Sequence, residues 1–208
     1  MLKIQRGVPG MSRFVLGAAF LGQAFAQTSP LVLIEEIPVP GWTNTGSTQA
    51  NFDLFAFNPR TQVMYVADRT NHAVTAIDTI RDGVIGVLPI PSGGSTNGVV
   101  VAIDEQKLVV TDGQAHVYVY DLRVPALAPE TYVVPQITAG TDALDYDPLN
   151  HTVYVINGTA PYFMTGIDLV NHNVRSQFAL PGSPKRMGKE LGKVAVSEVG
   201  FWGFAVWK

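Results

Sequence analysis

The chain has 208 residues, of which 47% are hydrophobic and 15% are charged, and its formal net charge is −3. This apolar content is enough for a packed core and excludes an intrinsically disordered chain. The small negative charge, with Lys and Arg scattered along the sequence, excludes a nucleic-acid partner and an anionic membrane surface. The absence of cysteine excludes disulfides, thiolate chemistry and Cys-based metal sites.

The first 26 residues have the pattern of a signal peptide. Lys3, Arg6 and Arg13 form a positive leader, residues 14–21 form a short apolar run, and residues 24–26 place alanines where signal peptidase reads small side chains. The apolar run is shorter than the roughly 20 residues that span a bilayer. We therefore expect cleavage after residue 26, no membrane span in the mature chain, and a secreted or periplasmic location. A retained anchor is the alternative.

From residue 52 the sequence repeats itself about every 45 residues, after a segment (27–51) that we expect to form an N-terminal strand or linker. Each repeat has a strand with a pair of Tyr or Val residues and, further on, a strand that ends in aspartate. The paired residues are Tyr65–Val66, Val109–Val110 and Tyr154–Val155, and the aspartates are Asp78, Asp121 and Asp168. A period of roughly 40 to 50 residues built from four short strands is typical of a propeller blade.

The strands predicted within these repeats are rich in β-branched and aromatic residues and are bounded by Asn, Asp, Gly and Pro. In chain order they cover residues 52–57, 63–67, 73–78, 84–89, 99–103, 107–111, 117–121, 131–134, 143–146, 152–156, 164–168 and 175–180. No window after the leader has the apolar period of a helix. The sequence therefore predicts an all-β fold, a partial β-propeller whose three four-stranded blades, with part of a fourth, begin at residue 52.

The segments Tyr65–Val66, Val117–Leu122 and Ile167–Leu169 resemble strands of the YVTN-type β-propeller repeat family of exported proteins. The resemblance covers about residues 52 to 184 and implies a propeller fold. Members of that family are mostly closed rings with more blades than this sequence contains. The shared motifs are specific for architecture and imply no activity.

The segment 186–208 departs from the repeat pattern. Residues 192–196 predict the second strand of a fourth blade, and residues 201–207 are rich in aromatics. We interpret the segment as an incomplete fourth blade or an aberrant tail, so that the blades (52–185) belong to a propeller truncated after three to four blades. The alternative is self-association, because an open stack of blades leaves strand edges and an apolar face exposed.

Asp53, Asn97 and Asp142 are the candidate ligand-binding residues. Each lies at or just before the start of the first strand of a repeat, and we expect all three to face the mouth of the central channel, where propellers bind ligands. Three oxygen-bearing side chains on one rim can hold Ca²⁺ or another divalent cation, or polarise a carbonyl. A solvated channel lining or a turn cap is the alternative.

The other polar positions are predicted to be structural. Aspartates that end the third strand of each repeat are expected to accept hydrogen bonds from the following turn, and the residues that close the second strand are expected to be turn residues: Asp68, Asp112 and Asn157. The histidines have no metal-binding spacing and are predicted to be surface turn residues: His72, His116, His151 and His172. No nucleophile elbow, P-loop or dinucleotide motif is present, so no catalytic residue and no cofactor other than the divalent cation is predicted.

These observations favour an exported binding or scaffold module that presents channel-rim loops to an unidentified protein or small-molecule ligand. The alternative is a hydrolase similar to the propeller lactonases and gluconolactonases, with a divalent metal in the channel. The resemblance to those enzymes lies in the blade pattern, and a fold by itself does not specify an activity.

Overall fold

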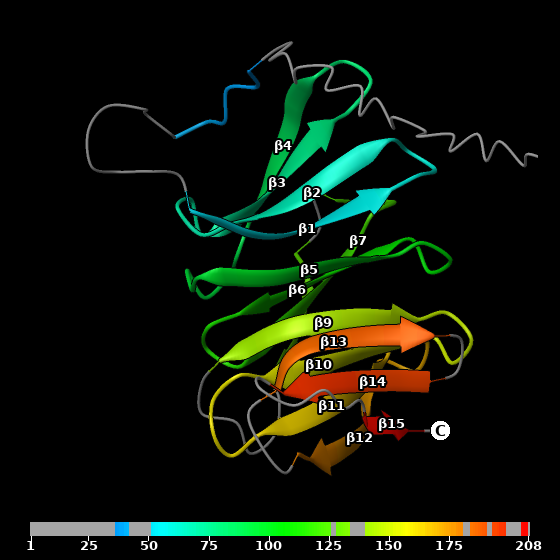
Figure 1. Cartoon of the computed structure of the whole chain (residues 1–208). Helices are drawn as coiled ribbons and strands as arrows, with labels where there is room; N and C mark the ends of the chain where they lie inside the picture. Colours follow the sequence, from blue (N-terminus) through cyan, green and yellow to red (C-terminus); the bar gives the residue numbers. More distant parts are fainter. Residues whose placement is uncertain are drawn as a thin grey trace, which may run out of the picture. The chain divides into compact units, whose positions relative to one another are not determined.

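The computed structural model describes residues 36–41, 51–125, 128–133 and 140–180, together with the backbone of three further strands between residues 184 and 207. The predicted signal peptide and most of the predicted linker lie outside the described residues. All regular secondary structure in the described part of the chain is β-strand (Figure 1). Within it, no helix is long and apolar enough to cross a bilayer.

Each of the three repeats forms one four-stranded antiparallel sheet whose strands pair in chain order. We name these sheets blade 1, blade 2 and blade 3. Blade 1 contains β1 (Phe52–Asn58), β2 (Val63–Asp68), β3 (Ala73–Asp78) and β4 (Gly83–Pro89). Blade 2 contains β5 (Thr96–Ala102), β6 (Lys107–Asp112), β7 (His116–Asp121) and β8 (Glu130–Val133). Blade 3 contains β9 (Thr141–Asp147), β10 (Thr152–Asn157), β11 (Phe163–Asp168) and β12 (Asn173–Ala179). The predicted all-β fold with three four-stranded blades is confirmed.

A further sheet follows blade 3 along the chain. It contains β13 (Pro184–Glu190), β14 (Lys193–Glu198) and β15 (Ala205–Trp207), and β14 pairs with both of its neighbours. The strand predicted at residues 192–196 corresponds to β14. Because β13 contacts β9, this fourth sheet continues the series of blades.

The turns of the blades repeat as the strands do. The turn between the first and second strands ends in a residue of positive φ in every blade: Gln62 (58°), Gln106 (53°) and His151 (52°). A left-handed residue at the end of a short turn returns the chain in antiparallel register. The repeated local geometry therefore explains why each blade has the same strand order.

The aspartates at the ends of the third strands cap the following turns, as predicted. Two backbone amides of the next turn donate to Asp78 at 2.9 and 3.0 Å, and Asp121 and Asp168 accept equivalent hydrogen bonds. Backbone hydrogen bonds lower the pKa of Asp78 and Asp168, because they favour the ionised carboxylate. The Arg123 side chain, followed by its backbone amide, lowers the pKa of Asp121 to about 2.

Apolar residues fill the two junctions between successive blades. In junction 1–2, the residues from blade 1 are Val63, Tyr65, Ala67, Val74 and Ala76, and those from blade 2 are Val99, Val101, Leu108, Val110, Tyr118 and Tyr120. In junction 2–3, the residues from blade 2 are Ala102, Val109, Val117 and Val119, and those from blade 3 are Leu144, Tyr146, Val153, Val155 and Ile167. Blade 2 therefore has two buried faces, and hydrophobic burial holds the blades face to face.

The first strands of successive blades lie next to one another: β1 beside β5, β5 beside β9, and β9 beside β13 (Figure 1). The pairing of β1, β5 and β9 is interrupted by a bulge just after the strand begins. A bulge breaks the alternation of inward and outward side chains. For this reason the predicted starts of two strands were wrong by two to three residues, since β5 begins at Thr96 and β9 at Thr141.

Candidate functional site

The three predicted rim residues occupy one equivalent position, the second residue of β1, β5 and β9. Asp53, Asn97 and Asp142 are each half-buried, and each lies at the bulge of its strand. A bulge redirects the local side chain and is frequent beside binding sites. Since the three strands are neighbours, the structure places the three side chains along one edge of the blades.

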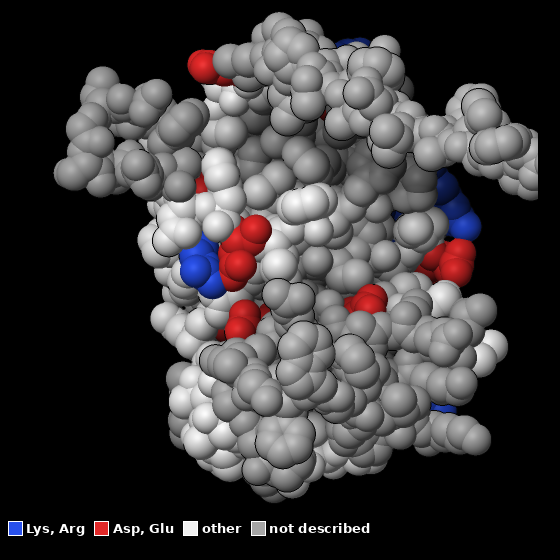
Figure 2. Space-filling view, viewed as in Figure 1, with Lys and Arg blue, Asp and Glu red and all other residues white. Residues whose placement is uncertain are grey.

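Arg69, which follows β2, joins two of these residues. Its Nη2 donates to Asp53 Oδ2 and, at 3.1 Å, to Asn97 Oδ1. Its Nε donates to the backbone oxygen of Thr96 at 3.3 Å. One guanidinium therefore connects blade 1 to blade 2. Figure 2 shows basic atoms directly beside acidic atoms in the region where β1 and β5 begin.

Asn97 extends this cluster to blade 3. Its Nδ2 donates to the backbone oxygen of Thr141 at 2.8 Å, and the Thr111 hydroxyl donates to the backbone oxygen of Asp142 at the same distance. The carboxylate of Asp142 makes no hydrogen bond with the described residues. A Cβ added at Gly158 would approach Asp142 Oδ2 to 3.2 Å, so the glycine leaves room beside this carboxylate. We call Asp53, Arg69, Asn97 and Asp142 the rim cluster.

The rim cluster holds two carboxylates and one guanidinium. Burial raises the pKa of Asp53, the nearby Arg69 lowers it, and the charge of Asp142 raises it again, with a net increase. The carboxylate of Asp142 in blade 3 is thus near enough to raise the pKa of Asp53 in blade 1. The cluster therefore combines one cationic hydrogen-bond donor, the Arg69 guanidinium, with two anionic acceptors, the carboxylates of Asp53 and Asp142.

The geometry of the rim cluster does not favour the predicted cation. The guanidinium of Arg69 occupies the oxygens of Asp53 and Asn97 that a hard cation would need. Among the described residues, no group of three or more His, Asp or Glu side chains is placed to hold a metal ion. The cluster is instead suited to hydrogen bonding.

Sequence reasoning missed Arg69 because it was read as part of a polar loop. A comparison of the repeats contains the missing signal. The equivalent positions after the second strands of blades 2 and 3 are glycines, Gly113 and Gly158, so a long cationic side chain at this position is the exception among the three blades. An exception at a repeated structural position indicates a local role, because the repeat itself does not require it.

The residues that close the second strands were predicted to be turn residues, but they are the buried last residues of β2, β6 and β10, and their side chains hydrogen-bond to the residues that follow. Asp112 is the most connected of them. Its Oδ2 accepts from Ser92 Oγ at 2.8 Å and from Tyr118 OH at 2.9 Å, and lies 3.0 Å from His116 Nδ1. Burial works to raise the pKa of Asp112, but the hydrogen bonds together bring it below its usual value. His116 stacks on Tyr118 in this network. The prediction that it is a surface turn residue was therefore wrong, since His116 begins β7.

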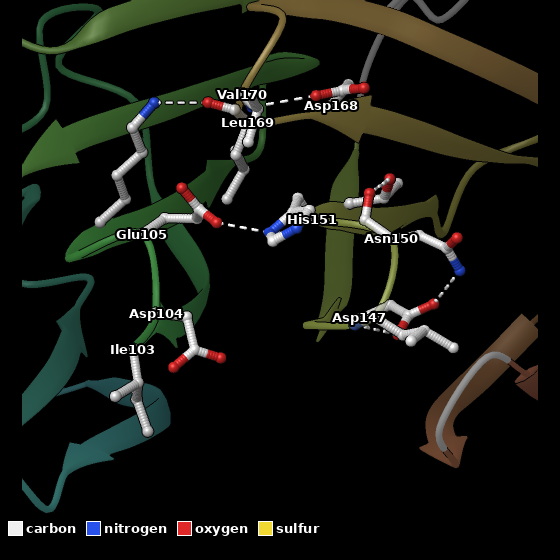
Figure 3. A network of polar contacts seen from close by, with 12 residues as sticks. Ile103, Asp104, Glu105, Asp147, Asn150, His151, Asp168, Leu169 and Val170 are labelled. Atoms are coloured by element: carbon white, nitrogen blue, oxygen red, sulfur yellow. Dashed lines mark hydrogen bonds and ion pairs between the residues drawn. The ribbon is translucent and has the colours of Figure 1, made fainter.

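The opposite ends of the first strands carry a different set of contacts, shown in part in Figure 3. His151 Nδ1 lies 2.5 Å from Glu105 Oε1, and Lys107 Nζ donates to the backbone oxygen of Leu169 at 2.6 Å. Between blades 1 and 2, Arg60 Nη2 pairs with Asp104 Oδ1 at 2.9 Å. Each contact joins one blade to the next, so these residues stabilise the junctions.

Comparison with solved structures identifies the architecture. A chain of the structure titled "Crystal Structure of Mitotic Checkpoint Complex" aligns with a TM-score of 0.65 at 14% identity, over 77% of this chain and 49% of that chain. A chain of Kuenenia stuttgartiensis hydrazine synthase aligns with a TM-score of 0.62 at 14% identity, over 80% of this chain and 48% of that chain. The protein thus spans about half the length of either matched chain.

At such low identity the likeness concerns the fold alone. No protein-family model matches the sequence, and no curated protein matches it. The sheets and the matched structures together define the class: this is an all-β protein with blades of the propeller type.

Proposed function

We propose that the protein is an exported binding or scaffold module whose rim cluster forms part of the recognition surface. The observation that carries the proposal is the convergence of Asp53, Arg69, Asn97 and Asp142 from three blades. Loops and strand ends held by a rigid β-scaffold are the usual positions of binding residues. Export is supported by the signal-peptide pattern of residues 1–26.

The unused hydrogen-bonding groups of the rim cluster suggest the chemistry of the ligand. Arg69 Nη1 and the carboxylate of Asp142 make no hydrogen bond with the described residues, and the Arg69 side chain is 32% exposed. A ligand that accepts from the guanidinium and donates to the carboxylate satisfies both groups. We therefore expect a small polar ligand that carries both donors and acceptors.

A thermal-shift screen tests this function. The probes are a fixed panel of monosaccharides, free amino acids and dicarboxylates, tested on the native protein and on Arg69→Ala and Asp142→Asn. We expect at least one probe to raise Tm of the native protein and to lose this effect in both variants. Arg60→Ala, which removes an exposed guanidinium at the other end of the first strands, is the control and should keep it. A stabilising probe that acts equally on all variants would exclude the rim cluster.

The same proteins separate the binding module from the hydrolase alternative. An aliphatic lactone is incubated with each protein in the presence of Ca²⁺ and in the presence of a chelator. The binding module predicts no turnover in either case. Metal-dependent lactone hydrolysis that disappears in Asp142→Asn would favour the hydrolase.

Mass spectrometry of the protein secreted by a bacterial host tests export, with a mature chain beginning at Gln27 as the expected result.

A further inference from the structure

The two faces of a blade have separate roles in the series. In blade 2, one face is covered by blade 1 and the other face covers blade 3. We call the face of a blade that is covered by the preceding blade its receiving face. In blades 2 and 3 it consists of two rows of residues paired directly across the strands: Val101–Leu108–Tyr120 and Val99–Val110–Tyr118, and then Tyr146–Val153–Ile167 and Leu144–Val155–Thr165.

Blade 1 has the same two rows at the equivalent positions. They are Phe57–Met64–Ile77 and Phe55–Val66–Thr75, again paired directly across the strands. No residue of these rows is charged. Blade 1 therefore also has a receiving face, although in the described part of the chain no blade precedes blade 1.

The β1 residues of the receiving face are far more exposed in blade 1 than their equivalents in the other two blades, whereas Met64 and Val66 on β2 are half-buried and Thr75 and Ile77 on β3 are buried. Phe55 is 68% exposed, whereas its equivalents Val99 and Leu144 are 5% and 9% exposed. Phe57 is 45% exposed, whereas Val101 is 7% exposed. Contiguous exposed apolar surface of this kind marks an interaction site in a soluble protein. The blade 1 face carries the chemistry of a blade-to-blade junction without the covering blade.

We propose that the receiving face of blade 1 docks onto the fourth sheet of a second copy of this chain. The fourth sheet ends the described series at the other side, where β13 already lies beside β9. Two copies related by a two-fold axis would form two such junctions at once and close a ring. The interaction continues the series of established junctions and introduces no new type of contact.

The number of sheets supports closure by two copies. The described part of one chain contributes four sheets, so these parts of a pair contribute about eight, and closed propellers have about four to eight blades. One chain also covers 49% and 48% of the matched chains, which share its fold. Cyclic two-fold assemblies are the commonest soluble oligomers, and closure leaves no receiving face exposed.

Light scattering coupled to size exclusion tests the pairing. We expect the native protein to have twice the mass of one chain, which is 22.4 kDa for all 208 residues and less once residues 1–26 are removed. Phe55→Glu and Phe57→Glu each place a charge on the receiving face and should return the mass to that of one chain. Ile80→Glu is the matched control, because Ile80 is 71% exposed in the turn after β3 and lies off the face, and it should remain paired. Circular dichroism checks that all variants stay folded. A native chain of single mass, or pairing that survives both Phe variants, would refute the proposal.

A single cysteine distinguishes the closed ring from two other ways of associating. The native chain has no cysteine, so Phe55→Cys introduces a unique thiol. In the ring the two receiving faces lie in different junctions, and we expect no disulfide between copies under oxidation. A disulfide-linked dimer would mean that two receiving faces pack on each other and would overturn the ring. A mass that grows beyond two copies with concentration would indicate an open stack and would overturn it as well.

Discussion

Junction 1–2 and junction 2–3 have equivalent apolar interiors and different polar rims. At junction 1–2, the guanidinium of Arg69 bridges the carboxylate of Asp53 and the amide of Asn97. At junction 2–3, Gly113 replaces the arginine, and its backbone oxygen accepts directly from Gly140 N at 3.0 Å. One junction is closed by a charged side chain, and the other by a backbone hydrogen bond together with the uncharged side chains of Asn97 and Thr111.

This comparison separates what the repeat requires from what a single position adds. The apolar rows recur in both junctions because each blade must bury its faces. The rim residues vary because a turn after the second strand tolerates either a glycine or a long side chain. A functional site on a repeat protein is therefore best sought where one blade departs from the others.

The largest expected effect concerns close packing at junction 2–3. A Cβ at Gly98 would meet Leu144 Cδ2 and would lie 2.5 Å from the backbone oxygen of Asp142. Because backbone cannot yield easily, Gly98→Ala should lower the free energy of unfolding by about 2 to 3 kcal/mol in urea titrations. Leu54 holds the equivalent position in blade 1 and is 41% exposed, so Leu54→Ala should lower the free energy of unfolding by about 1 kcal/mol or less. Equal losses would show that the two junctions are packed alike.

A pair of threonines sharpens the same comparison. The hydroxyl of Thr141 donates to the backbone oxygen of Asp112, whereas the hydroxyl of Thr96, at the equivalent position in blade 2, is buried without a hydrogen-bond partner. Thr141→Val should therefore lower the free energy of unfolding by about 1 to 2 kcal/mol. Thr96→Val removes an unsatisfied buried group and should leave stability unchanged or raise it by about 1 kcal/mol. Urea titrations in which both variants lose stability equally would contradict this difference.

The charged rim of junction 1–2 predicts a pH-dependent effect of Arg69→Ala. Without the guanidinium, Asp53 keeps only its burial and the repulsion from Asp142, both of which raise its pKa. A carboxylate whose pKa is raised by folding destabilises the folded state when it is ionised. The free energy of unfolding of the variant should therefore be lower by about 1 kcal/mol at pH 7, and this loss should shrink as the pH falls towards about 4, where Asp53 becomes protonated in the folded state.

Arg60→Ala provides the control for this charge effect, since its ion pair with Asp104 is exposed on both sides. Its free energy of unfolding should change by less than about 0.5 kcal/mol at either pH. A loss in Arg69→Ala that is the same at pH 7 and at pH 3.5 would mean that the arginine acts through packing.

The smallest expected effect comes from the turn caps. The pKa of Asp121 is lowered to about 2, first by the Arg123 side chain, from an unfolded value of about 3.9. Its contribution to stability is therefore present above about pH 4 and is lost as the pH falls towards about 2. Asp121→Asn should be slightly less stable than the native protein at pH 6 and indistinguishable from it at pH 2, by urea midpoint. Asp82→Asn, a change at an exposed turn residue, should have no effect at either pH.

Much of the fold was predictable because short-range patterns determine it. The second and third strands of each blade are short runs rich in β-branched and aromatic residues bounded by turn residues, and β3 was predicted with its observed bounds, Ala73–Asp78. The first strands were less predictable, because the polar residues Asn97 and Asp142 lie at a bulge that continues the strand beyond its β-branched and aromatic run. His116 was also misjudged, because β7 begins at His116, one residue earlier than predicted.

The rim residues were expected to lie close together because equivalent positions of successive blades share one edge, and they do lie on neighbouring strands; their role in binding stays a prediction. Their hydrogen bonding was not predictable. Arg69 donates to Asn97 across a junction, although it precedes Asn97 by 28 positions in the chain. A repeat period places strands but contains no information about which side chain from the preceding blade fills the space beside them.

The sequence by itself determined the all-β fold, the three four-stranded blades and the turn caps, because these depend on residue types and on residues a few positions apart. Only the tertiary structure decided that Arg69 closes the rim of junction 1–2 and that Phe55 and Phe57 on the receiving face of blade 1 are exposed while their equivalents in blades 2 and 3 are covered. The physical reason is that both depend on contacts between separate sheets. The free energy of such a contact depends on which surface lies opposite, and that is known once the sheets are placed against each other.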